Sequence, residues 1–442
     1  MRVLICDIER DDRRRSQLDE ACDVVIGPEV LGDSGDCRGC LSCWTATPGP
    51  CVIRDAPGDL GALLGAADEL WIASRNTFGA VSSPVKCALD RWIPAAHPCS
   101  RIIDRKTHHR RRYGGSARAG GTGTRTRTSI WLYGASSACE RSCFMQIAST
   151  MCDDVGLDLV GVWFPERADE LGVASAAFEG ARPGQPVRAS DARPSARPLP
   201  GRIACVCASP NGDASATSLL LDDFEDAFYA YERISAHSFE DDARAVRDEH
   251  AEIIRFQMSA DGELRQREVV GSSCDATSSL ETLASCDTIV IGYPVYLAAL
   301  PSGAIRLLEQ LSEMDALARG ARIYAISNLG LYDAARGRAA CGVLGCFCRV
   351  ADLMWGGALV VAGDGMIVPT AGTPRMGRLR RRTSEAIDQL ILAVRTGASI
   401  MATDGIIEVP CALPRFLYRW KMRRRCRALA RETGRGPDED PR

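Results

Sequence analysis

A hydroxyl-rich segment near the middle of the chain has the residue types that bind a phosphate monoester. It runs from Ala208 to Ser218, directly after an apolar run and directly before Leu219–Leu221, which begins a helix-forming stretch. A helix N-terminus offers oriented N–H donors and a positive dipole end, and Ser and Thr add hydrogen bonds without net charge. Capping of the helix by Ser215 or Thr217 alone would explain the same residues, so both interpretations stay open. The candidate phosphate ligands are Ser209, Asn211, Ser215, Thr217 and Ser218.

A second segment in the same half could hold a flat polar heterocycle. The apolar run 287–292 leads into an aromatic loop, Tyr293–Leu297, and then into a helix-forming stretch. Backbone N–H and C=O groups of such a loop can meet the edge of a heterocycle such as a flavin, while Tyr296 covers part of its face. Tyr296 could instead be an ordinary core aromatic, and residue type alone favours that alternative.

Four cysteines in the first half have spacings typical of metal or cluster ligands. Cys37, Cys40, Cys43 and Cys51 form a C-x2-C-x2-C-x7-C array. Three close Cys and one distant Cys resemble iron–sulfur ligation, although the ferredoxin run ends in a three-residue spacer followed by Pro. Zinc sites usually separate two C-x2-C pairs by a longer stretch. Packing of small apolar side chains around a turn at Gly39 is the remaining alternative.

The elements that must position these residues alternate between short apolar runs and helix-forming stretches. This alternation predicts parallel sheets with helices on both faces, because parallel neighbours need a crossover helix. Ligands of such sheets bind beyond the C-terminal strand ends, where both candidate segments of the second half lie. The predicted strands are Arg2–Cys6, Val24–Ile26, Glu69–Ala73, Ser129–Tyr133 and Leu159–Phe164 in the first half, and Arg202–Ala208, Arg233–His237, Asp287–Gly292, Arg322–Ser327 and Gly357–Ala362 in the second.

Composition divides the chain into two similar halves. The Pro-, Arg- and Gly-rich stretch between them suits an extended linker. We therefore predict an α/β protein with two doubly wound domains, each with a five-stranded parallel sheet. The predicted parts are a first domain at 1–181, a linker at 182–200, a second domain at 201–410 and a basic tail at 411–442. Gly114–Thr128 is expected to be a mobile loop and acidic Glu240–Glu252 an insertion.

The first half lacks a comparable phosphate segment. Four carboxylates follow its first strand and would repel a phosphate unless Arg13–Arg15 offset them. We expect no phosphate site in this half. The acidic residues are Asp7, Glu9, Asp11 and Asp12.

Overall charge and hydropathy exclude several classes of protein. The 442 residues have a formal net charge of −3 and 46% hydrophobic content, so no global field recruits nucleic acid or an anionic membrane. No apolar run is long enough to span a bilayer, which predicts a cytoplasmic protein. The 20 Cys suit a reducing compartment. The basic part of the tail, Arg415–Arg435, is expected to be a solvated helix face. Docking on the acidic insertion of a second copy, binding of the extra phosphate of NADPH, and contact with membrane lipid are the alternatives.

Several motifs together resemble the flavodoxin-like NADPH-dependent FMN reductase and iron–sulfur flavoprotein group. In the first half they are Cys37-x-Gly39-Cys40-x-x-Cys43-Trp44, Gly49-x-Cys51-Val52-Ile53-x-Asp55, and Lys86 to Arg91. The second half is similar to tandem flavodoxin-family proteins, through its Ser209-Pro210 loop, Pro294-x-Tyr296, Leu300-Pro301-Ser302, Asn328-x-Gly330-x-Tyr332, Trp355-Gly356 and Pro414–Tyr418. The likeness covers nearly the whole chain apart from the linker and insertions.

The resemblance implies a function and a set of binding residues. It implies non-covalent FMN, reduction by NADH or NADPH, and transfer of electrons to a small-molecule or protein acceptor, with a 4Fe-4S cluster on the four Cys as relay. No catalytic acid or base is expected, because the flavin carries the chemistry. A non-catalytic electron carrier or partner-binding scaffold is the alternative, and homo-oligomerisation is left open. The residues implied to line the flavin ring are Pro294, Val295, Tyr296, Leu297, Asn328 and Gly330.

Overall fold

The chain forms two compact units in a computed structural model that describes residues 1–55, 60–103, 106–112, 126–166, 201–238, 251–259, 262–267, 276–314, 317 and 320–432. Unit 1 comprises Met1–Pro186, Tyr296–Arg306 and Pro414–Arg442. Unit 2 comprises Val187–Val295 and Leu307–Leu413. Two segments from the later part of the chain thus belong to unit 1. The expected linker, and most of both expected insertions, lie outside the described residues.

The sheet of unit 1 has five parallel strands in the order β2-β1-β3-β7-β8. Numbered by their place in the chain, the parallel strands follow the order 2-1-3-4-5 of flavodoxin-like proteins. All five predicted strands are confirmed, and a short strand, β4, pairs antiparallel with β3. The strands are β1 (Arg2–Cys6), β2 (Val24–Ile26), β3 (Glu69–Thr77), β4 (Ala80–Val81), β7 (Arg127–Tyr133) and β8 (Asp158–Trp163), beside a separate hairpin of β5 (Ala96–Ile103) and β6 (Lys106–Arg111).

Successive strand residues of unit 1 pack on opposite faces of its sheet. Val3 and Ile5 belong to a core cluster with α4, α5 and α6, whereas Leu4 and Cys6 pack with Leu18 of α1. This alternation follows from the two-residue period of a strand. The helices are α1 (Arg13–Ala21), α2 (Pro28–Leu31), α3 (Ser42–Thr45), α4 (Leu60–Ala66), α5 (Ser83–Asp90), α6 (Ala138–Val155) and α13 (Arg415–Glu432).

The sheet of unit 2 repeats this order and extends it at both edges. Its strands lie in the order β11-β10-β9-β12-β13-β14-β15, and all pairs are parallel except β10 with β11. The five central strands again follow 2-1-3-4-5. Both units therefore have the flavodoxin-like fold. The strands are β9 (Arg202–Cys207), β10 (Glu252–Met258), β11 (Leu264–Gln266), β12 (Thr288–Pro294), β13 (Arg322–Leu329), β14 (Met354–Ala362) and β15 (Ile406–Val409).

One predicted strand of unit 2 is wrong. Arg233–His237 lies in the last turns of a long helix, α7 (Ala216–Ser238), and not in the sheet. The second strand of the sheet is instead β10, which begins at Glu252. The helix continues because the apolar positions Phe224, Ala227 and Phe228 keep helical spacing and are fully buried.

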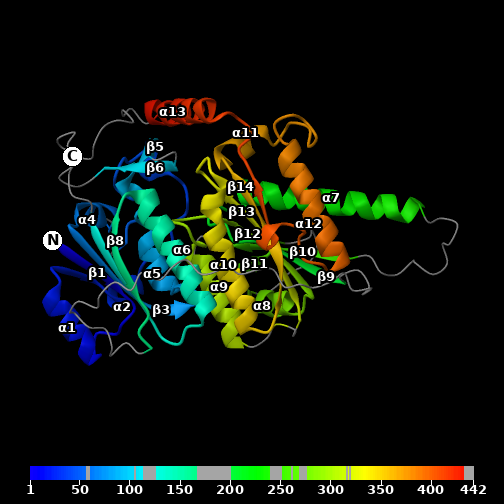
Figure 1. Ribbon diagram of the computed structural model, residues 1–442. Helices are drawn as coiled ribbons and strands as arrows, with labels where there is room; N and C mark the ends of the chain where they lie inside the picture. The colour runs from blue at the N-terminus through cyan, green and yellow to red at the C-terminus, as the bar shows by residue number, and fades with distance from the viewer. Residues whose placement is uncertain are drawn as a thin grey trace. The chain divides into compact units, whose positions relative to one another are not determined.

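Helices cover both faces of the unit 2 sheet (Figure 1). On one face α7 and α12 share a core with Cys205, Val290 and Leu359. On the other, α10 contacts β13 and β14, and Gly337 just before α10 lies against Val360. The remaining helices are α8 (Ala276–Ala284), α9 (Ser302–Met314), α10 (Arg338–Val350), α11 (Ile367–Thr370) and α12 (Arg381–Thr396), of which α9 begins in unit 1.

No helix in the described ranges has the length and apolar character needed to cross a bilayer.

Candidate functional site

The hydroxyl-rich segment joins β9 to α7 at the C-terminal edge of the unit 2 sheet. Asn211 precedes a short 3-10 turn, Gly212–Ala214. Ser215 follows the turn and is the N-cap residue immediately before α7. Ser215 Oγ accepts the amide of Ser218 at 3.0 Å, and the Ser215 carbonyl accepts the amide of Leu219 at 3.3 Å. The capping role considered for Ser215 is therefore present. Capping by itself does not exclude an anion, because a helix leaves several first-turn amides without intrahelical partners.

A buried hydroxyl of the segment takes part in hydrogen bonds that connect the ends of neighbouring strands. Thr217 is fully buried and donates to Asn328 Oδ1 at 2.7 Å, and Asn328 Nδ2 donates to Asp364 at 3.2 Å. This chain of hydrogen bonds links α7 to the end of β13 and to the loop after β14. Asn328 thus presents its side chain to Thr217 and Asp364. The Asn328 carbonyl accepts the amide of Val295 at 2.8 Å, which aligns the end of β12 with that of β13.

A buried guanidinium lies beside the start of α7. Arg255 of β10 is 9% exposed, donates to Asp222 at 2.7 Å, and contacts Ser218 Oγ at 3.5 Å. Among the described residues its Nη1 has no hydrogen-bond partner. Its Nε also lies 3.8 Å from a Glu225 carboxylate oxygen. The helix N-terminus therefore supplies the positive potential at the first turn of α7, and the Arg255 charge beside it is paired with two carboxylates. Sequence reasoning missed Arg255 because β10 was not among the predicted strands.

The surface of the segment is open where a ligand would approach. Ser209, Ser215, Thr217 and Ser218 are buried, whereas Asn211, Asp213 and Ala214 are exposed. Gly212 has a φ of +60° and nothing within 4 Å of where a Cβ would stand, and Gly330 likewise faces open space. Ala216 and Thr217 are the first two residues of α7, and the first amides of a helix have no acceptor within the helix. An anion here would meet backbone donors, with the buried hydroxyls holding the loop in shape.

Two residues implied to line the ring belong to unit 1 and not to unit 2. Tyr296 and Ala299 exchange backbone hydrogen bonds at 3.0 and 3.1 Å, and Leu297 and Ala298 both have positive φ. A Cβ built on Gly39 would overlap the Tyr296 hydroxyl. The Tyr296 ring therefore lies against the loop that holds the four candidate Cys. Pro294 and Val295 stay with the unit 2 sheet.

The Cys loop, residues 35–55, is closed at its base by a buried ion pair. Arg91 is 1% exposed and binds Asp55 through both Nη atoms at 2.8 Å. The same guanidinium donates to the Gly35 carbonyl at 2.9 Å, and Asp55 accepts the Gly35 amide at 2.8 Å. Farther along the loop, the Trp44 indole donates to the Ile93 carbonyl at 2.9 Å. The loop is thus an ordered part of unit 1.

Its four thiols lie close enough to influence one another. Burial, the Asp90 carboxylate and the Cys51 and Cys40 thiols act on Cys37, and its pKa is raised to about 12. Burial followed by Cys37, Cys51 and Cys40 raises the pKa of Cys43. Cys40 is exposed and Cys51 half-buried. In the metal-free chain Cys37 and Cys43 are therefore neutral thiols at pH 7, and any ligation by them must release protons.

Within the described ranges, no three Cys, His, Asp or Glu side chains converge tightly enough to hold one metal ion. A 4Fe-4S cluster places each thiolate on a different iron, so its ligands need not meet at one point. Cluster ligation, zinc binding and apolar packing therefore all stay open as interpretations of these residues.

A buried polar network ties the 296–306 segment to α5. Lys86 and Asp90, each 1% exposed, form an ion pair one helical turn apart. Lys86 also donates to the Tyr296 carbonyl at 3.0 Å, and Asp90 accepts the amide of Ser302 at 2.9 Å. Burial raises the pKa of Asp90 to about 6 against the opposing effect of the Lys86 ammonium. The charged pair therefore positions Tyr296 through its backbone.

Asp36 extends this network from the Cys loop. It accepts the Ser302 hydroxyl at 2.7 Å and both Nη atoms of Arg306 at 2.8 and 3.1 Å. Asp36 immediately precedes Cys37, so the first turn of α9 is hydrogen-bonded to the start of the Cys loop. The sequence gives no local signal for these contacts, because their partners lie more than 200 residues apart in the chain.

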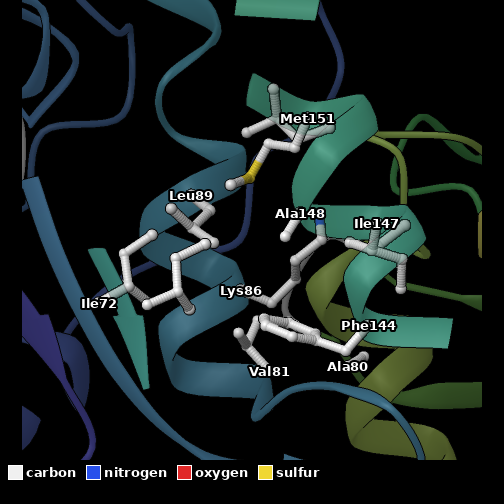
Figure 2. Close-up of a pocket in the computed structure, with 12 residues that line it drawn as sticks. Ile72, Ala80, Val81, Lys86, Leu89, Phe144, Ile147, Ala148 and Met151 are labelled. Carbon is white, nitrogen blue, oxygen red and sulfur yellow. The ribbon is translucent and has the colours of Figure 1, made fainter. Parts of the chain in front are cut away.

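The Lys86 side chain also borders a small cavity of about 10 Å³ in unit 1 (Figure 2). Figure 2 shows Phe144, Ile147, Ala148 and Met151 of α6 on one side of it. A cavity of this volume holds no more than one water molecule. It is too small for a heterocycle, so it provides no flavin site in unit 1.

At the C-terminal edge of the unit 1 sheet, the Asp7 carboxylate accepts hydrogen bonds from groups that could otherwise bind an anionic ligand. Asp7 accepts Tyr133 Oη at 2.7 Å, Ser82 Oγ at 2.6 Å and the Arg75 amide at 3.0 Å, with Ser74 Oγ at 3.3 Å. Asp7 and burial raise the pKa of Tyr133, with burial the larger cause. These four donors are thus paired with a carboxylate of the protein itself.

Unit 2 also contains a cavity of about 240 Å³ that the sequence did not suggest. It lies between α7, the end of β14 and the start of α12, with Leu220, Val361 and Met366 among its apolar walls. Asp223 at its rim forms an ion pair with Arg380, which also donates to the carbonyls of Ala371 and Thr373. These contacts fix the loop before α12.

Comparison with known proteins gives a likeness of fold. No protein-family model and no curated protein matches the sequence. Among solved structures, the chain is similar to the Trp repressor binding protein from Bacillus subtilis, at 13% identity and a TM-score of 0.24, over 38% of this chain and 94% of that one. It is also similar to an azoreductase from Bacillus anthracis, at 12% identity and a TM-score of 0.27, over 44% of this chain and 99% of that one.

A third similar structure is a flavoprotein in complex with FMN from Lactobacillus acidophilus. The identity is 12% and the TM-score 0.21, over 39% of this chain and 99% of that one. Each of the three matches spans less than half of this chain. Since these scores are low, the fold assignment rests on the strand order of the two sheets.

Replacing Gly39 by Ala is expected to destabilise unit 1 by about 3 kcal/mol. Gly39 has a φ of +62°, which a Cβ disfavours, and the new methyl group would also meet the Tyr296 hydroxyl. Urea unfolding followed by Trp fluorescence measures the effect, because six of the seven Trp lie in unit 1.

Gly156→Ala is the matched control, since Gly156 has a φ of +70° and no neighbour within 4 Å. It should cost about 1–2 kcal/mol, the backbone contribution alone. Gly39→Ala combined with Tyr296→Phe should recover part of the loss. Equal costs for the two Gly variants would show that Tyr296 does not contact the loop in solution.

Proposed function

We propose that this protein is an FMN-dependent NAD(P)H oxidoreductase whose flavin phosphate binds at the start of α7 in unit 2. The observation that carries the proposal is the hydroxyl-rich turn between the first strand of a 2-1-3-4-5 sheet and a 23-residue helix. Ligands of this fold bind beyond the strand C-termini, and a phosphate at a helix N-terminus meets oriented amides and a positive dipole end.

The residues of the turn fit a phosphate monoester in shape and charge. Gly212 leaves its surface open, Ser215 caps the helix, and the guanidinium of Arg255, which is paired with carboxylates of α7, lies near Ser218. Thr217 and Asn328 keep the strand-end loops in register. The proposed phosphate ligands are the backbone amides of the turn with Ser209, Asn211, Ser215, Thr217 and Ser218 around them.

The proposed ring contacts come from the loops that follow β12 and β13. Pro294 ends β12, Val295 follows it, and Gly330 leaves open space beyond β13. When bound, FMN would supply hydride acceptance from a nicotinamide and electron delivery to an acceptor. The protein would contribute binding, orientation and exclusion of water. The proposed ring-lining roles of Tyr296, Leu297 and Asn328 rest on the family resemblance alone.

NAD(P)H oxidation that depends on added FMN tests the proposed activity. We expect the purified full chain to oxidise NADH or NADPH only after loading with FMN, in the presence of an artificial acceptor such as a quinone. Rapid FMN binding without any direct NAD(P)H oxidation would instead identify an electron carrier supplied by another protein. Neither FMN binding nor oxidation would favour a partner-binding scaffold.

We further propose that Cys37, Cys40, Cys43 and Cys51 ligate a 4Fe-4S cluster. The loop is anchored by Arg91 and Asp55, and the Cys40 and Cys51 thiols act on the pKa of both Cys37 and Cys43. Since burial raises the pKa of Cys37 to about 12, incorporation should release protons and increase with pH. This cluster is independent of the flavin proposal.

Iron and labile sulfide analysis after anaerobic purification tests the cluster. Cys40→Ala should lower both to background, whereas Cys22→Ala, a half-buried Cys of unit 1 outside the loop, should leave them unchanged. Background iron and sulfide in the unaltered chain would assign the four Cys to packing.

A further inference from the structure

The C-terminal helix α13 has one buried side and one exposed side. It belongs to unit 1, where it packs on α3 and β5. Tyr418 and Cys426, about two turns apart, are 4% and 8% exposed. Phe416 and Trp420, one turn apart, are 71% and 57% exposed, and neighbouring Leu417 is 39% exposed. The helix therefore holds its inner side against unit 1 and presents large apolar side chains to solvent.

The same helix has a net positive charge, whereas the rest of the chain has a net negative charge. Arg415–Glu432 contains eight Lys or Arg and one Glu, a net charge of +7. The whole chain carries −3, so the remainder carries −10. The Arg424 guanidinium lies 5.4 Å from the centre of the Trp420 ring, so basic and aromatic groups share the exposed side. The exposed basic residues are Arg423, Arg424, Arg425, Arg427 and Arg431.

We propose that α13 docks the protein on an anionic lipid surface. Exposed Arg side chains attract anionic headgroups, and exposed Phe and Trp side chains bury in the boundary between headgroups and acyl chains. A helix that bound a nucleic acid or an acidic protein by charge alone would gain nothing from exposed Phe416. The combination of both groups on one side therefore favours lipid. The proposal does not depend on flavin binding.

Vesicle flotation with the full chain tests this proposal. We expect the protein to float with phosphatidylcholine vesicles that contain phosphatidylglycerol and not with phosphatidylcholine alone. Binding should weaken as salt is raised, because screening acts on exposed charges. Phe416→Ala with Trp420→Ala should weaken binding about tenfold at constant charge, since both aromatic side chains would otherwise be buried in the interface.

Two double variants that remove the same charge distinguish an effect of α13 from an effect of the net charge of the protein. Arg423→Gln with Arg424→Gln should weaken vesicle binding about tenfold. Arg381→Gln with Arg382→Gln removes the same charge from exposed positions of α12 and should leave binding unchanged. Circular dichroism checks that every variant is folded. Three results would overturn the proposal. They are an equal loss of binding in the two Arg double variants, no binding to anionic vesicles, and binding that does not change when Phe416 and Trp420 are replaced.

Discussion

Replacing Ser215 by Asp is expected to weaken FMN binding about a hundredfold without loss of stability. Ser215 caps α7 through its Oγ, and Asp caps a helix as well as Ser does. The new carboxylate would stand beside the proposed phosphate. At a separation of about 4 Å and an effective dielectric constant of about 20, two negative charges repel by about 4 kcal/mol, which partial exposure reduces to about 3. Quenching of FMN fluorescence on titration measures the change in Kd.

Ser215→Asn is the matched control for this variant. Asn has nearly the shape of Asp, caps helices equally well and carries no charge. Its Kd for FMN should stay within a few-fold of the original, and both variants should unfold at the same urea concentration as the unaltered protein. FMN binding by Ser215→Asp as tight as that of Ser215→Asn would place the phosphate away from α7.

Removing the Asp90 carboxylate is expected to destabilise unit 1 by about 3–5 kcal/mol. Asp90→Ala leaves the Lys86 ammonium buried without its counter-ion and the Ser302 amide without its acceptor. The measurement belongs at pH 8, where Asp90, with a pKa of about 6, is ionised. Urea unfolding followed by Trp fluorescence reports mainly on unit 1, which holds six of the seven Trp.

The double variant Lys86→Met with Asp90→Leu tests whether the unpaired Lys86 ammonium causes the loss of stability. Replacing a buried ion pair by apolar side chains of similar volume is often nearly neutral, so most of the lost stability should return. An exposed pair of the same spacing, Arg381 and Glu385 in α12, gives a second control. Arg381→Ala should not measurably shift urea unfolding followed by circular dichroism, which reports on both units. Little loss in Asp90→Ala would mean that Lys86 is hydrated or neutral in the native protein.

Most of the fold was predictable because buried parallel strands are contiguous apolar runs. Nine of the ten predicted strands lie in the two sheets, and Arg2–Cys6 and Val24–Ile26 match to the residue. Arg233–His237 failed because a five-residue window cannot separate a short strand from the end of a long helix. β10 was missed because it begins directly after an acidic stretch that suggested an insertion.

The site was predictable only where it depends on local sequence. The cap at Ser215 and the helix after it follow from residue types in one segment. The contacts of Tyr296 with Lys86 and Gly39, and of Asp36 with Arg306, join residues more than 200 positions apart. Asp7 was expected to repel a phosphate, but its acceptance of Tyr133 and Ser82 required the folded sheet. Pairings of this kind depend on topology and have no local signature.

The most direct test of the central claim is a titration of the flavin-free full chain with FMN. The claim is that the turn before α7 holds the phosphate of one mononucleotide. Riboflavin, which lacks that phosphate, serves as the comparison ligand. We predict saturable binding of one FMN per chain and much weaker binding of riboflavin. No binding of FMN, or equal affinity for FMN and riboflavin, would contradict the account.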